Sequence, residues 1–122
     1  MLARWVLVIL VVGCASVPRN DGSTIRDEAY ALNREGMIAM SEARFEDAID
    51  LFERASALVT DYGIQGKPLL YTPIFMAGWA SEKIGRIPQA CASYRRFLTI
   101  APADLVERTK ADHAAGHLAA HC

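Results

Sequence analysis

Residues 32–55, LNREGMIAMSEARFEDAIDLFERA, decide the fold of this chain. Apolar residues recur in this stretch at steps of three and four, the spacing that places them on one face of an α-helix. The first series ends near Ser41, and the second runs from Phe45 to Val59. The stretch therefore predicts two amphipathic helices joined by a short turn, with the first helix starting near a possible capping residue, Thr24.

The next apolar series predicts a third helix. Pro73 is suited to the first helical position, where a missing N–H costs no hydrogen bond, and Thr72 can cap that start. An earlier start at Leu69, with a kink at the proline, stays open. The helix is expected to end at Gly85, because glycine readily adopts the left-handed conformation of a helix stop.

A fourth helix is expected to begin at Pro88 and to end before Pro102, since proline cannot continue an upstream helix. An alanine-rich segment from about Ala103 to residue 121 predicts a fifth helix with a thinner apolar face. No segment alternates apolar and polar residues with period two, so we expect no sheet and an all-α fold.

The two predicted helix pairs share a residue pattern that resembles the tetratricopeptide repeat. The pattern consists of a large residue, Gly, a small residue, aromatics and Ala at fixed spacings. Its first copy is Leu32, Gly36, Ala39, Phe45, Ala48, Phe52 and Ala55, and its second is Ile74, Gly78, Ser81, Gly85, Ile87, Ala90, Tyr94, Phe97 and Pro102. The resemblance implies a short right-handed α-solenoid with repeats at about 29–62 and 71–102, capped by a helix at about 103–121.

The chain departs from this family in its spacing. Ala48 and Ala90 lie 42 residues apart, whereas consecutive repeats of the family are about 34 residues apart. The extra residues enlarge the junction around Gly63 and Gly66. An unrelated antiparallel helical bundle stays open as the alternative.

The resemblance also implies a binding groove, because the first helix of each pair lines the inner curve of such a solenoid. The implied groove residues are Tyr30, Asn33, Met37, Met40 and Ser41 in the first repeat, and Thr72, Phe75, Met76, Trp79, Glu82 and Lys83 in the second. Phe75 and Trp79 lie four residues apart and could form an apolar floor for a peptide. The alternative is that Phe75, Met76 or Trp79 packs in the core. The family's cationic clamp for a C-terminal carboxylate is not reproduced.

The N-terminus has the features of an export signal. Arg4 precedes the apolar run 5–12, which is too short to span a bilayer. The quartet Val11-Val12-Gly13-Cys14 resembles the lipobox of bacterial lipoproteins. That resemblance implies removal of residues 1–13, lipidation of Cys14 and a tether over 14–23. With Ala15 after the cysteine, it implies an outer-membrane anchor facing the periplasm. An ordinary secretory signal, or an exposed apolar N-terminus, stays open.

Charge and motifs narrow the function classes. The 122 residues carry 13 basic and 14 acidic side chains, so the field that attracts proteins to nucleic acid is missing. The length fits a single folded domain at 24–122. No nucleophile elbow, phosphate-binding glycine loop or paired zinc-ligand spacing is present, so we expect neither an enzyme nor a cofactor. The sequence favours a membrane-anchored module that binds another protein or peptide of the cell envelope.

A histidine series suggests a second function class. His113, His117 and His121 are spaced by four, and neighbours at this step can share a metal ion on one helix face. All three cannot meet at a single ion, because residues eight apart on a helix are about 12 Å apart. An exposed polar face is the competing interpretation, and a periplasmic metal-binding protein is the alternative function.

Cys91 and Cys122 could form a disulfide in an oxidising compartment. An antiparallel packing of the fourth and fifth helices argues against this bridge. It would place Cys91 opposite a residue near Asp112, about 15 Å of helix from Cys122. A bend at Gly116 could close the gap, so both possibilities stay open.

Overall fold

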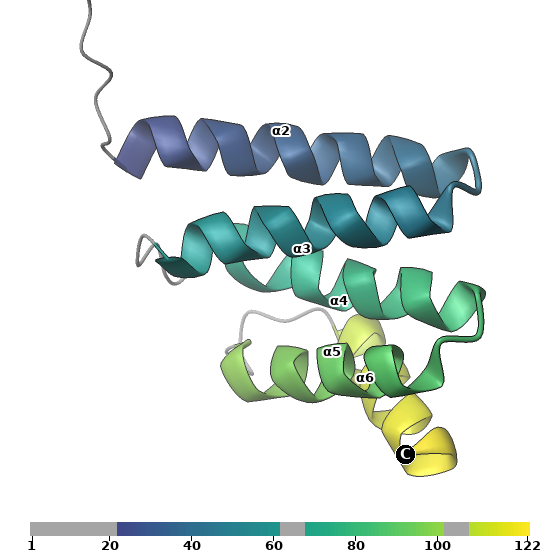
Figure 1. Cartoon of the computed structure of the whole chain (residues 1–122). Coiled ribbons are helices and arrows are strands. Elements are labelled where there is room, and N and C mark those ends of the chain that lie inside the picture. The colour runs from purple at the N-terminus through teal and green to yellow at the C-terminus, as the bar shows by residue number, and fades with distance from the viewer. Residues whose placement is uncertain (1–21, 62–67, 102–107) are drawn as a thin grey trace, which may run out of the picture.

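The chain folds into a stack of helices. A computed structural model describes residues 22–61, 68–101 and 108–122. Five helices lie in these ranges, and no strand does: α2 (Gly22–Ser41), α3 (Phe45–Asp61), α4 (Pro68–Lys83), α5 (Ile87–Ile100) and α6 (Arg108–His121). Each helix packs mainly against the next one in the chain, and α2 also contacts α4. The two pairs α2–α3 and α4–α5 form a short α-solenoid, to which α6 is added (Figure 1). The expected all-α fold is confirmed.

Two helix starts differ from the sequence-based expectation. α4 begins at Pro68, so the expected start at Pro73 was wrong and Pro73 lies inside the helix. The earlier start that stayed open, at Leu69, is one residue from the observed one. A proline in the second turn removes one backbone hydrogen bond, and burial of Tyr71, at 5% exposure, and of Pro73 itself offsets this cost. α2 begins at Gly22, which places Thr24 within the first turn instead of at the cap. The expected fifth-helix start near residue 103 lies outside the described residues.

Two glycines set the distance between the helices of each pair. A Cβ atom at Gly36 would lie 2.6 Å from Cε1 of Phe52, and one at Gly78 would lie 2.8 Å from Cε1 of Tyr94. Both rings are fully buried. Each aromatic side chain therefore fills the space left by a missing side chain on the neighbouring helix, and the contact is the same in both pairs.

The turns within the two pairs are also equivalent. Ala43, with φ of 58°, and Gly85, with φ of 73°, occupy the left-handed region at positions 42 residues apart. In each turn the next backbone amide donates to a carbonyl of the preceding helix, at 2.8 Å and 2.9 Å respectively. The chain thus repeats one helix–turn–helix unit.

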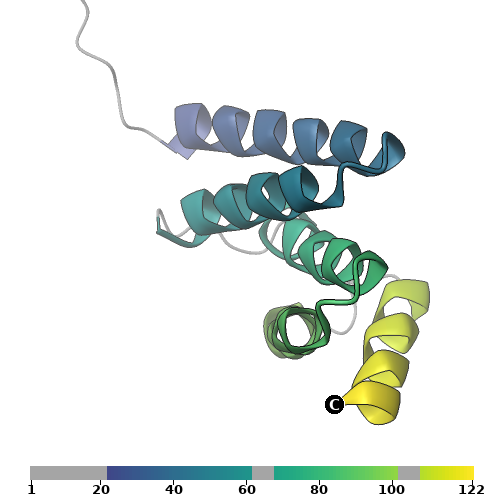
Figure 2. The same cartoon turned by 45° about the vertical axis from the view of Figure 1, so that its right-hand side comes forward.

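The last helix crosses α5 steeply instead of running antiparallel to it. In Figure 2, α5 is seen nearly end-on while α6 runs across the view. The structure contains the disulfide Cys91–Cys122, with a Cα–Cα distance of 6.1 Å. The antiparallel packing that opposed this bridge was therefore the wrong assumption. No break at Gly116 is needed, because α6 is continuous through it.

Candidate functional site: an apolar hollow between three helices

A hollow of about 380 Å³ opens between α2, α4 and α6. The described residues that line it are mainly apolar and include no carboxylate: Met37, Phe75, Met76, Trp79, Thr109, Lys110 and His113. Its volume lies within the range of about 300–1,000 Å³ that is typical of ligand-binding clefts. The structure thus brings together four of the expected groove residues, Met37, Phe75, Met76 and Trp79.

These four residues differ in how far they are exposed. Phe75 and Met76 are 5% and 4% exposed and belong to the main core, so the core interpretation applies to them and they form the floor of the hollow. Met37 is 45% exposed and Trp79 is half-buried. The Lys83 ammonium lies 5.5 Å from the centre of the Trp79 ring, a cation–π contact.

The other expected groove residues lie outside the lining. Tyr30 is exposed and sits seven residues from Met37, so it extends the same face of α2. Met40 packs against the core, and the Ser41 hydroxyl donates to the carbonyl of Ile38. Thr72 and Asn33 are half-buried, and the Asn33 Oδ1 atom is buried without a hydrogen-bond donor.

Glu82 connects α4 to two other helices. One of its carboxylate oxygens accepts a hydrogen bond from the Tyr94 hydroxyl at 2.8 Å and lies 2.9 Å from Nε2 of His113. Partial burial opposes its ionisation, but the hydrogen bonds from Tyr94 and His113 outweigh this and hold the pKa of Glu82 below its usual value. Burial and the Glu82 carboxylate raise the pKa of Tyr94. Glu82 is therefore committed to holding α6 in place and does not face a ligand.

The sequence reasoning missed this role, although one signal was present. Glu82 is the only acidic residue of α4, a helix that is otherwise nearly uncharged. A single carboxylate in a largely buried helix is expected to have a hydrogen-bond donor or a cation beside it, because burying an unpaired charge is unfavourable.

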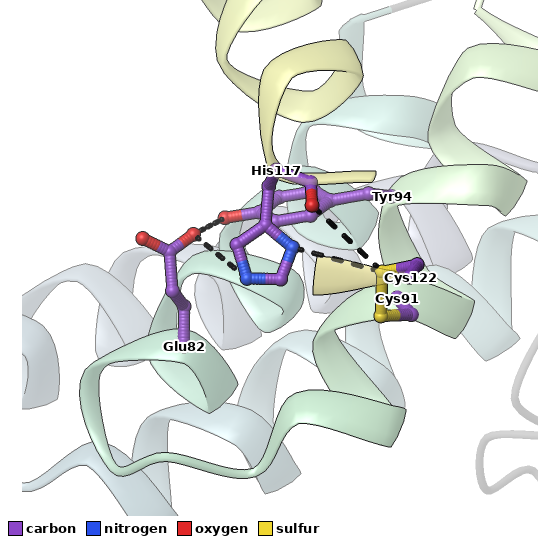
Figure 3. The surroundings of a disulfide bond; sticks show 5 residues. All are labelled: Glu82, Cys91, Tyr94, His117 and Cys122. Atoms are coloured by element: carbon purple, nitrogen blue, oxygen red, sulfur yellow. Dashed lines mark hydrogen bonds and ion pairs between the residues drawn. A yellow bond between two sulfur atoms is a disulfide. The ribbon is translucent and has the colours of Figure 1, made fainter. Parts of the chain in front are cut away.

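The histidines of α6 have three different surroundings. His113 contacts Glu82 and packs edge-on against the rings of Phe75 and Tyr94. His117 is buried beside the disulfide (Figure 3). His121 is exposed, and its ring centre lies 4.8 Å from that of His117. The three side chains thus form a row along α6 with no common point.

A second hollow of about 400 Å³ lies between α3, α4 and α5. It includes Glu53, Ser56, Thr60 and Arg96 and is more polar than the first. None of the expected groove residues lines it. The hollow bounded by α2, α4 and α6 is therefore the candidate site.

No protein-family model, curated protein or solved structure matches the chain. Among the residues that the structure describes, no helix is both long enough and apolar enough to cross a bilayer. What the fold and the hollow define is a class: a small helical solenoid with an apolar hollow bounded by the first helix of each pair and by the last helix.

Proposed function

We propose that this protein is a membrane-anchored protein-interaction module whose hollow between α2, α4 and α6 binds an apolar peptide segment of a cell-envelope partner. The observation that carries the proposal is the joint position of Met37 and Trp79, from two different repeats, on the rim of one apolar hollow. Met and Trp side chains are favoured at binding surfaces, because methionine adapts its shape and tryptophan supplies a large contact area.

The exposure of α2 supports this proposal. Tyr30 and Met37 are both at least 45% exposed, although each is a large apolar side chain. Complete burial of a fully exposed side chain of this size is favourable by about 1.5–3 kcal/mol, and covering the exposed half of each gains about half of that. A partner that covers the face of α2 bearing Tyr30 and Met37 gains this energy, which the isolated chain does not use.

The lining also indicates the chemistry of the partner. Among the described residues, the lining includes Lys110 and no carboxylate, and Lys83 stands beside the Trp79 ring. An apolar segment flanked by acidic residues fits this set of side chains better than a basic one.

The membrane anchor is the second part of the proposal. The lipobox-like quartet ending at Cys14 lies outside the described residues, and it supports lipidation of Cys14 through its resemblance alone. Residues 15–21 would then separate the lipidated cysteine from α2, which begins at Gly22, and the domain would face the periplasm. Metabolic labelling with a clickable fatty acid tests the anchor: label on the wild type and none on Cys14→Ser is expected, and equal label on both would contradict it.

Binding is tested with the mature chain starting at Cys14, in which Trp79 is the single tryptophan. Its fluorescence reports occupation of the hollow when apolar peptides with acidic flanks are added. Trp79→Ala, with unchanged helicity, is expected to abolish capture of the partner. The proposal fails if the fluorescence stays constant across the peptide panel and the partner is still captured by Trp79→Ala.

A further inference from the structure

The end of α6 places a histidine against the disulfide. Ligand atoms of Cys91, His117 and Cys122 all lie within 4.8 Å of one another. Nδ1 of His117 lies 3.9 Å from Sγ of Cys122, and the His117 side chain is 5% exposed. Two sulfurs and an imidazole nitrogen thus converge at one point on the α5–α6 contact (Figure 3).

The orientation of the His117 ring is specific. Nδ1 faces the sulfurs, whereas Nε2 faces the Glu82 carboxylate at 3.8 Å and is buried without a hydrogen-bond partner (Figure 3). Histidines that bind metals commonly point one nitrogen at the ion and donate the other N–H to a carboxylate. In the disulfide form, the sulfurs lie near Nδ1 and the Glu82 carboxylate lies near Nε2, but no hydrogen bond forms at Nε2 among the described residues.

We propose that, when the disulfide is reduced, Cys91, Cys122 and His117 form a zinc site in which Glu82 positions the histidine. The ligands are the two thiolates and Nδ1 of His117, and a water molecule takes the fourth position on the side where Cys122 is exposed. The proposal does not depend on peptide binding in the hollow.

The distances are close to those that zinc requires. With Zn–S at about 2.3 Å and Zn–N at about 2.0 Å, tetrahedral ligands lie about 3.5 Å apart for a sulfur and a nitrogen, and about 3.8 Å apart for two sulfurs. The observed separation of Nδ1 from Sγ of Cys122 is 3.9 Å. The sulfurs must move apart once their bond is cut, and Cys122 can move because it is exposed and lies one residue beyond the end of α6.

Charge balance favours zinc over a thiolate pair without metal. Two thiolates neutralise Zn²⁺, so the buried side of the site next to Tyr94 takes up no net charge. The ring centres of Tyr94 and His117 are 5.1 Å apart, and both residues are buried. Sulfur and imidazole ligands together are typical of zinc sites.

The redox step needs a dithiol donor. The donor transfers two electrons and two protons, the Cys91–Cys122 bond breaks to give two thiols, and the donor becomes a disulfide. Zinc then displaces the two thiol protons, which pass to the solvent. Binding therefore releases two protons for each ion, and only the reduced form binds.

The site differs from the histidine row expected from the sequence. In that row, neighbouring histidines share the ion on a helix face, so His121 would contribute as much as His117. In the site proposed here, His117 is essential and His121 is not. His121→Asn and His117→Asn therefore form a matched pair on the same helix.

The test uses the full chain with Cys14→Ser, so that Cys91 and Cys122 are the only thiols. The chain is reduced with a phosphine, thiols are counted, and zinc is titrated in competition with a coloured chelator. We expect one zinc ion per reduced chain and no competition from the disulfide form. Glu82→Gln should weaken binding about tenfold, as loss of such a partner does elsewhere. His117→Asn should weaken it more, and His121→Asn should leave it unchanged.

Cobalt provides a second measurement that does not depend on affinity. A thiolate-to-cobalt charge-transfer band is expected in the reduced chain and should be lost in Cys91→Ser, with circular dichroism reporting helicity throughout. The proposal is overturned if the reduced chain binds no zinc, whether or not it stays helical. It is also overturned if the disulfide form binds equally well, or if His121→Asn has the same effect as His117→Asn.

Discussion

Replacement of Gly36 by alanine tests the packing that defines each helix pair. The new Cβ would lie 2.6 Å from Cε1 of Phe52 and 2.9 Å from Cδ1 and Cζ, so ring and helix must move apart by roughly 1 Å to reach ordinary contact. Phe52 is fully buried and has no free space to move into.

The magnitude follows from two opposing terms. Overpacking of this kind costs about 1–3 kcal/mol, and a displacement near 1 Å at a fully buried ring belongs in the upper part of that range. Alanine gains about 1 kcal/mol over glycine as a helix residue. We therefore expect Gly36→Ala to lower the free energy of unfolding by about 1–2 kcal/mol.

Gly116 provides the matched control. It is also inside a helix, but a Cβ there would meet nothing within 4 Å. Gly116→Ala should therefore raise the free energy of unfolding, by up to about 1 kcal/mol. Urea unfolding followed by circular dichroism measures both variants, and an unchanged m-value shows that the folded and unfolded states compared are the same.

A double-mutant cycle identifies the cause. Phe52→Leu shortens the side chain that meets the new Cβ, so the two changes together should cost less than the sum of their separate costs. The reasoning is refuted if Gly36→Ala is as stabilising as Gly116→Ala, or if its effect is additive with Phe52→Leu.

Three further outcomes are expected. Ala43→Gly should stabilise the fold by about 0.5–1 kcal/mol and Gly85→Ala should destabilise it by a similar amount, because both positions have a left-handed backbone conformation that is unfavourable for a residue with a Cβ atom. Urea unfolding measures both changes, and effects of the same sign would contradict this reasoning. The pKa of Glu82 is below its ordinary value of 4.5, so its carboxylate stabilises the fold above that pH, and this contribution is lost as the pH falls through the lower pKa of the folded state. Acid unfolding of Glu82→Gln should therefore depend less steeply on pH than that of the wild type. Identical curves would disprove the role of Tyr94 and His113 as partners of Glu82. Removal of the disulfide by Cys122→Ser should cost up to about 3.7 kcal/mol, the loop-closure value for a separation of 31 residues, and no change in the urea midpoint would show that the bridge does not hold α6.

The helices could be predicted from the sequence because their information is local. Apolar spacing located α2 to α6, the helices of the described ranges, and the glycine–aromatic pattern anticipated the contacts of Gly36 and Gly78. The start of α4 was misplaced because Pro73 was taken as the first helical position, whereas burial of Tyr71 and Pro73 compensates for one missing hydrogen bond inside the helix. Rules based on neighbouring residues alone cannot compare the free energy of a lost hydrogen bond with that of burying side chains.

The site was less predictable because it depends on how α6 lies. Spacing placed Phe75 and Met76 on the correct face of a helix, but their burial depends on the rings around them. The disulfide and the convergence of His117 with the two cysteines depend on a crossing angle that no local pattern encodes. An assumed antiparallel packing therefore argued against a bridge that the structure contains.

The most direct test of peptide binding compares two neighbouring residues of α2. Met37 lines the hollow and Ile38 does not, although their exposures are similar, at 45% and 48%. A photo-crosslinking amino acid is placed at either position in cells, and adducts are identified by mass spectrometry. The account predicts one defined protein adduct from position 37 that is lost with Trp79→Ala, and little or none from position 38. Equal adducts from both positions, or an adduct from position 37 that persists with Trp79→Ala, would contradict it.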